Sequence, residues 1–138
     1  MTKLDPAIHE LASGPNYGVL ATLMPGGWPQ TSVVWVDSDG EQLLVNTEVH
    51  RQKFQNISRD DRVSVVVWDH EQPDREGEVR GRVVDTVTGS DAREHIDRLS
   101  QKYTGAPYGV PIKSERVILR IEPVHQVPPT AGKNTPSS

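Results

Sequence analysis

Three strand-like segments follow one another early in the chain, and the turns between them are too short to hold a helix. The segments are 17–24, 29–36 and 42–46, all rich in Val, Leu or Thr, residues that favour strands. Pro25-Gly26-Gly27 and the Asp-Ser-Asp-Gly sequence before the third segment are strong turn signals. This succession excludes a fold that begins with alternating strands and helices. It predicts a meander in which 42–46 continues the hairpin of the first two segments.

Three further strands are expected in the second half of the chain. Segment 62–68 contains the most apolar run, and 77–87 alternates around Gly81, where a bulge or close backbone approach is expected. Segment 116–124 alternates apolar with charged residues. Six antiparallel strands with helices at their rims predict a mainly β protein built as a small closed barrel.

Three helices are predicted between these strands. Asp5 and Pro6 are suited to begin the first helix. A short helix is expected within 47–59, its first turn capped by Thr47. The sequence Thr-Gly-Ser-Asp at 88–91 has a capping-box pattern, and the apolar residues after it recur at helical spacing.

Length and composition predict one domain with little apolar material. A chain of 138 residues is the size of one ordinary domain. Only 34% of its residues are hydrophobic, so association into an oligomer would help it bury surface. We expect a single barrel domain at 1–127 and a disordered tail at 128–138, which has no apolar anchor.

Removing residues 129–138 is expected to leave the melting temperature unchanged within error. Ordering the backbone costs roughly 1 to 2 kcal/mol per residue, and the polar composition of this segment cannot offset that cost. Calorimetry of the full and shortened chains checks the prediction. A large drop in Tm would show that the segment docks on the barrel or on a partner.

Composition and motifs also exclude several classes of function. The sequence contains no cysteine, which excludes a disulfide framework, a thiolate metal site and a cysteine nucleophile. Its histidines are scattered and lack the spacing of metal ligands. The net charge of −4 argues against nucleic-acid binding. The sequence contains no dinucleotide-binding, P-loop, serine-hydrolase or zincin motif. With no membrane-spanning run and no signal peptide, we expect a cytoplasmic protein without membrane contact.

The segment 47–56 gathers a hydroxyl, two cations and a predicted helix start at the end of a strand. Thr47, Arg51 and Lys53 could bind an anion there, because the first amides of a helix and its dipole favour negative charge. The alternative is that Arg51 and Lys53 are solvated charges on an exposed helix. The spacing alone leaves both interpretations open.

Several short motifs occur in a fixed order along the chain. They are YGVLATL from Tyr17, PQTSVVW from Pro29, LVNT ending at Thr47, RQKFQNI from Arg51 and RVILRIEP from Arg116. This order resembles the pyridoxamine 5'-phosphate oxidase-like split β-barrel superfamily. Within it, the chain looks most similar to small deazaflavin enzymes that use coenzyme F420. The resemblance runs from about 17 to 124.

The resemblance implies a six-stranded, FMN-binding-like split barrel that forms a homodimer, with cofactor sites between the subunits. It implies that Thr47, Arg51 and Lys53, with Gln52 as a weaker candidate, hold the cofactor phosphate. It also implies that the second strand contacts the cofactor ring through Ser32, Val33 and Val34. The activity implied is hydride transfer from the reduced deazaflavin to a small electron-poor organic molecule.

Two alternatives to the F420 enzyme are an FMN-binding oxidoreductase of the same superfamily and a non-catalytic module that binds F420 or flavin. Flavin-binding oxidases of the superfamily usually have adjacent Arg and Lys where this chain has Gln52 and Lys53, which favours F420. No residue stands out as a catalytic acid or base. That is expected where the cofactor supplies the hydride and the protein supplies positioning. Tyr108, in a Gly/Pro loop, is a candidate for substrate contact.

Overall fold

The computed structural model describes residues 3–130, which form three helices and one sheet of seven strands. The helices are α1 (Pro6–Ser13), α2 (Gln52–Arg59) and α3 (Ser90–Thr104). The strands are β1 (Tyr17–Leu23), β2 (Pro29–Trp35), β3 (Asp37–Ser38), β4 (Leu43–Glu48), β5 (Arg62–Trp68), β6 (Glu76–Val87) and β7 (Arg116–Val127). No helix of this described part is long and apolar enough to cross a membrane.

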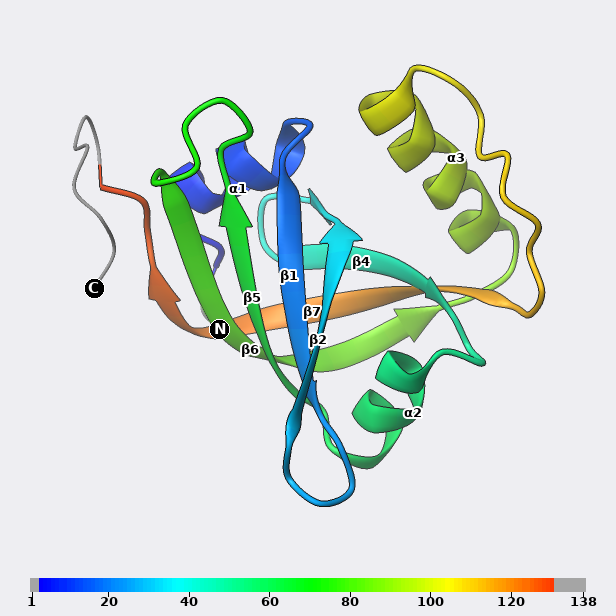
Figure 1. Cartoon of the computed structure of the whole chain (residues 1–138). Helices are drawn as coiled ribbons and strands as arrows, with labels where there is room; N and C mark the ends of the chain where they lie inside the picture. Colours follow the sequence, from blue (N-terminus) through cyan, green and yellow to red (C-terminus); the bar gives the residue numbers. More distant parts are fainter. Residues whose placement is uncertain (1–2, 131–138) are drawn as a thin grey trace.

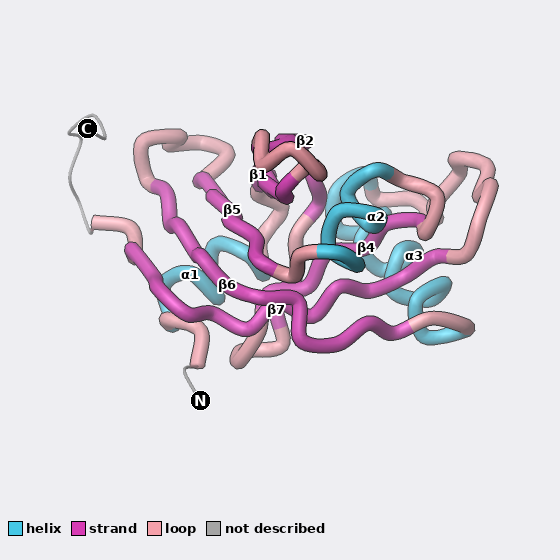
Figure 2. The backbone as a smooth tube through the Cα atoms, turned by 90° about the horizontal axis from the view of Figure 1, so that it is seen from below, coloured by secondary structure: helices cyan, strands magenta, loops and turns pink. Residues whose placement is uncertain are grey.

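The sheet is antiparallel throughout and strongly curved, with the strand order β2-β1-β5-β6-β7-β4-β3 (Figures 1 and 2). Its two edges, β2 and β3, are consecutive in sequence, so the chain passes from one edge of the sheet to the other within two residues. The sheet therefore curls into a split barrel with helices around it. This confirms the mainly β split-barrel prediction.

Two details of the predicted strand arrangement are wrong. The described residues form seven strands rather than six, because Asp37 and Ser38, assigned to a turn, pair with Leu44 and Leu43 as β3. The segment 42–46 also does not continue the first hairpin. As part of β4 it lies between β7 and β3 and pairs with both.

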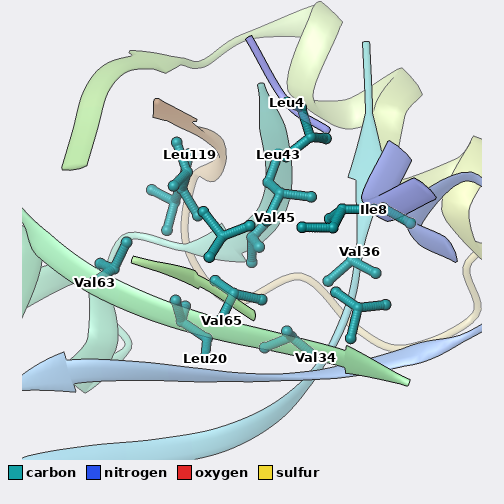
Figure 3. Packing of buried hydrophobic residues seen from close by; sticks show 14 of the residues in the cluster. Leu4, Ile8, Leu20, Val34, Val36, Leu43, Val45, Val63, Val65 and Leu119 are labelled. Carbon is teal, nitrogen blue, oxygen red and sulfur yellow. The ribbon is translucent and has the colours of Figure 1, made fainter. Parts of the chain in front are cut away.

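The barrel interior is filled by aliphatic side chains from most of the strands and from α1 (Figure 3). Val34, Val45, Leu119 and Ile8 are among them, and each is at least nine-tenths buried. Leu44 faces the other way and packs with Ala92 and Ile118 beneath α3. Because both faces of β4 are covered, its first three residues are all buried. Asn46 lies on the same face of β4 as Leu44 and donates to the carbonyl of Ala92 on α3.

The helix starts match the sequence prediction only for α1. There the Asp5 carboxylate accepts a hydrogen bond of 2.8 Å from the amide of Ala7, with Pro6 in the first turn. Thr47 does not cap α2; it lies in β4, and α2 begins at Gln52. The capping box at 88–91 is also wrong, because Gly89 is the N-cap of α3 and no side chain caps it.

The bulge expected at Gly81 is present. Pairing between β6 and β7 passes from Arg80–His125 to Gly81–Pro123, which leaves Val124 as the extra residue. Proline has no amide hydrogen to donate, so a regular ladder is interrupted at this point. Of the predicted tail, 128–130 carry no helix or strand, and 131–138 lie outside the described residues. The single-domain boundary at 127 stays a prediction.

Candidate functional site

A hollow of about 290 Å³ lies where β2 and β4 approach each other without pairing, at the opening of the split barrel. Its walls come from β2, β4, the start of α2, α3 and the loop before β7. The lining residues are Val33, Val34, Trp35, Asn46, Thr47, Arg51, Lys53, Ile96, Tyr108, Val110 and Arg116. An apolar wall thus faces a polar one that carries three cations.

Two of these cations come from the start of α2. Arg51 is the N-cap residue, but its side chain makes no capping hydrogen bond, so the first amides of the helix have no side-chain acceptor. Within residues 3–130, neither Arg51 nor Lys53 has a carboxylate within 4.0 Å. Unpaired cations beside uncapped amides form an electrostatic environment that favours an anion.

Lys53 shows the accumulated positive charge most directly. Its side chain is half-buried, and burial lowers the pKa of its ammonium group below the usual value. The neighbouring Arg51 and Arg116 lower this pKa further. A bound anion would relieve this repulsion, so these three residues are suited to hold a phosphate.

Thr47 adds a hydroxyl at the end of β4. The residue is 4% exposed, and its hydroxyl makes no hydrogen bond to another described residue. Because Thr47 also lines the hollow, its hydroxyl is available to a ligand bound there.

Arg116 is the third cation, and Glu48 balances it. The two residues lie directly opposite each other on β7 and β4, with 3.4 Å between Arg116 Nη1 and Glu48 Oε2. Both are buried, at 7% and 2% exposed. Burial alone would raise the pKa of Glu48, but the amides of Ser114 and Lys113 and the charges of Arg116 and His50 hold it below its usual value.

Aromatic rings form the opposite side of the hollow. The ring of Trp35 stacks on Tyr103 with 5.1 Å between centroids, and Tyr108 meets Trp35 edge-on at 6.2 Å. The Tyr103 hydroxyl donates to the carbonyl of Asn16 at 2.6 Å and accepts from the amide of Val36 at 3.0 Å. Burial raises the pKa of Tyr103 to about 12. This pair fixes α3 against the end of β2 and holds Trp35 in place.

The hollow brings together five of the seven residues predicted as cofactor contacts. They are Val33, Val34, Thr47, Arg51 and Lys53. Ser32 and Gln52 do not line it. The side chain of Gln52 turns along α2 and donates to Asn56 Oδ1 at 2.8 Å.

Sequence reasoning missed Arg116 and Asn46. Arg116 stood in the sequence as one charged residue of an alternating strand. Only the register of β4 against β7, joining residues about 70 positions apart, places it beside Thr47 and Glu48. Tyr108, singled out as a loop residue, does line the hollow, whereas Trp28 is 79% exposed outside it.

Comparison with known proteins identifies this architecture. The family model described as pyridoxamine 5'-phosphate oxidase matches residues 4–126. The chain belongs to the pyridoxamine 5'-phosphate oxidase family. The resemblance inferred from the order of the motifs is therefore confirmed, and the hollow lies in a fold that binds flavin-type cofactors.

Solved structures similar to this family member include one named F420 reductase. It is 32% identical, with a TM-score of 0.77, over 90% of this chain and 98% of that one. A conserved hypothetical protein from Mycobacterium tuberculosis is 28% identical, with a TM-score of 0.63, over 91% of this chain and 82% of that one. General Stress Protein 26 from Bacillus anthracis, at 19% identity and a TM-score of 0.62, shares the fold over 87% of this chain and 88% of that one.

Among the other hollows of residues 3–130, two can be compared with this one. One, of about 350 Å³, is lined by three arginines that each pair with a carboxylate: Arg62 with Asp60, Arg80 with Glu78, and Arg82 with Asp61. The other, of about 410 Å³, lies beside His95 and carries both acidic and basic side chains. Residues 3–130 contain no group of three potential metal ligands. Of the three hollows, the one with unpaired cations best fits a phosphate-bearing cofactor.

Proposed function

We propose that this protein is a coenzyme F420-dependent oxidoreductase that reduces a small electron-poor organic molecule. The observation that carries the proposal is the meeting of unpaired Arg51 and Lys53, the unpaired Thr47 hydroxyl and uncapped helix amides in one hollow. The 32% identity to a protein named F420 reductase supports the deazaflavin over FMN.

Different residues of the hollow would hold different parts of such a cofactor. Arg51, Lys53 and Thr47 would bind its phosphate, while β2 would lie along its ring. Because β2 is an edge strand, one side of its backbone has no strand partner in the described sheet and can donate or accept hydrogen bonds. The cofactor, when bound, supplies the hydride, and the protein supplies position and charge.

A homodimer would complete this site. At 290 Å³ the hollow is at the small end of the range for ligand pockets, roughly 300 to 1,000 Å³. It is too small to hold the whole of the proposed cofactor. Val33 lines it and is 65% exposed, so the cofactor ring would extend over an apolar surface. A second copy of the chain would cover that surface.

Sedimentation at micromolar concentration is expected to give about twice the mass of one chain. Burying the exposed apolar wall around Val33 and Val110 favours association. The measurement is made with and without cofactor. A monomer that binds the cofactor at full affinity would contradict the shared site.

The basic cluster can be tested by substitution. In Lys53→Ala the dissociation constant for coenzyme F420 is expected to rise about tenfold to a hundredfold, because one charge-assisted hydrogen bond is lost. Arg51→Ala is expected to weaken binding in the same direction. Fluorescence titration measures these constants. A solvated surface cation would instead contribute about 0 to 1 kcal/mol.

Arg98→Ala is the matched control, since this exposed arginine lies on α3 and does not line the hollow. Its dissociation constant should equal that of the parent. If all three variants bind as the parent does, the phosphate assignment is wrong. Parallel titration with FMN separates the cofactors, and FMN that copurifies with the protein would favour the flavin enzyme.

A cofactor-binding module without turnover is the second candidate. It is favoured by one observation: the residues lining the hollow include no histidine and no carboxylic acid, so Tyr108 is the neutral acid among them. A reaction that needs a proton donor has few sources there. Tight F420 binding without oxidation of the reduced cofactor by quinones or enones would support the module.

A further inference from the structure

A buried series of hydrogen bonds links Asp37, His95, Asn46 and Arg116, and it runs from beneath α3 into the hollow between β2 and β4. His95, on the face of α3 toward the sheet, is 1% exposed. Its Nε2 lies 3.0 Å from Asp37 Oδ2, and its Nδ1 lies 3.1 Å from Asn46 Nδ2. The Oδ1 of Asn46 accepts a hydrogen bond of 2.8 Å from Arg116 Nε. Figure 1 shows α3 alongside β4, the strand that carries Asn46.

The donors and acceptors of these four side chains fix how each of them is oriented. Arginine only donates, so the oxygen of the Asn46 amide faces Arg116. The amide nitrogen then faces His95 and also donates to the carbonyl of Ala92 at 2.9 Å. A ring nitrogen that receives this hydrogen bond carries no hydrogen. His95 is therefore neutral, with its hydrogen on Nε2 and donated to Asp37.

We propose that His95 is a positioning residue for the cofactor site: its neutral ring locks the Asn46 amide, which in turn orients the Arg116 guanidinium. This rests on the proposed function only for the identity of the ligand. His95 does not line the hollow itself. Nε of Arg116 is held by Asn46 and Nη1 by Glu48, so the plane of the guanidinium is set by two fixed contacts.

Protonation of His95 would reverse the orientation of the Asn46 amide. A hydrogen on Nδ1 would face the amide nitrogen of Asn46, and two donors repel. Relief comes when the amide turns over, which gives its oxygen to His95 and points its nitrogen at Arg116. Arg116 then loses an acceptor and gains a repelling donor. With His95 protonated, the site would thus bind anions more weakly.

Charged residues from several elements surround the His95 ring. Asp37 on β3 contacts the ring, and burial alone would raise its pKa, but the hydrogen bond from His95 helps hold the pKa below its usual value. The hollow beside the ring also contains charged residues from α3, from the β3–β4 turn and from β7. They are Asp91, Glu94 and Arg98, Asp39, and Arg120. Arg120 and Asp39 neutralise each other at 2.7 Å.

The test compares the parent with His95→Asn and His95→Leu. Asparagine offers an acceptor near the position of Nδ1 but does not titrate, whereas leucine offers none. We expect His95→Asn to bind coenzyme F420 like the parent and His95→Leu to bind it about tenfold more weakly. Equal affinity of the parent and His95→Leu would overturn the proposal.

A ligand-free measurement separates this proposal from the proposed function. In nitrogen-15 NMR spectra, His95 should appear as the Nε2–H tautomer, and the Arg116 Nε–H should be protected from exchange at pH 8. That protection should remain in His95→Asn and be lost in His95→Leu. If the parent binds neither F420 nor FMN, the proposed function fails, and these spectra still decide the positioning role. A histidine with its hydrogen on Nδ1 at pH 8 would overturn it.

Discussion

Replacing Glu48 by glutamine is expected to lower the free energy of unfolding by about 3 to 5 kcal/mol at neutral pH. The glutamine could still accept from the amides of Lys113 and Ser114, which lie 2.8 and 2.7 Å from Glu48 Oε1. It could not balance the charge of Arg116, which is 7% exposed and would be left with no carboxylate within 4.0 Å among the described residues. Removing one partner of a buried ion pair is costly because the other charge stays buried.

The loss should depend on pH in a defined direction. The pKa of Glu48 is held below its ordinary value of 4.5, so the native state favours its charged form. A carboxyl of this kind contributes its stability above the unfolded pKa and loses it as the pH falls through the native pKa. The difference between the parent and Glu48→Gln should therefore be full at pH 7 and shrink from about pH 4.5 downward.

Urea unfolding at a series of pH values measures this difference. Glu115→Gln is the matched control, because Glu115 is exposed and its side chain makes no hydrogen bond or ion pair with another described residue. That variant should lie within about 0.5 kcal/mol of the parent throughout. A constant difference between the parent and Glu48→Gln down to pH 3 would contradict an ionised Glu48 in the native state.

The sequence predicted most elements of this fold because the information that forms them is local. Apolar alternation marked the longer strands, and Asp5 with Pro6 marked the start of α1. The errors concern pairing over long distances. Nothing near 42–46 shows that it pairs with β7, and Asp37 and Ser38 form a strand only because β4 lies beside them. Tertiary contacts outweighed the local turn signal there.

The candidate site divides in the same way. Arg51 and Lys53 could be found from the sequence because they stand within one short segment, beside a predicted helix start. Arg116 could not, since it enters the hollow through its register opposite Glu48. Gln52 was predicted from its place in the same short segment, yet it does not line the hollow. Its sequence neighbours do, but helical geometry turns its side chain toward Asn56, four residues on. Proximity in sequence therefore does not ensure a shared site.

Replacing Gly81 by alanine is expected to destabilise the protein by about 3 kcal/mol, the upper end of the usual cost of overpacking. A Cβ at this position would overlap the backbone carbonyl oxygen of Glu122 and come within 3.1 Å of Ile121 Cγ2. The carbonyl cannot move aside cheaply, because β6 and β7 are paired on both sides of the bulge. The strain would fall on β7, the strand that pairs with β4 and carries Arg116.

Gly109→Ala is the control for this substitution. A Cβ there meets nothing within 4 Å, and its backbone does not require a positive φ. Restricting the unfolded chain should leave that variant as stable as the parent or slightly more so. Thermal and urea unfolding of both variants check the prediction. If Gly81→Ala unfolds at the parent's midpoint, the close approach of β6 to β7 is absent in solution, and the bulge does not need glycine.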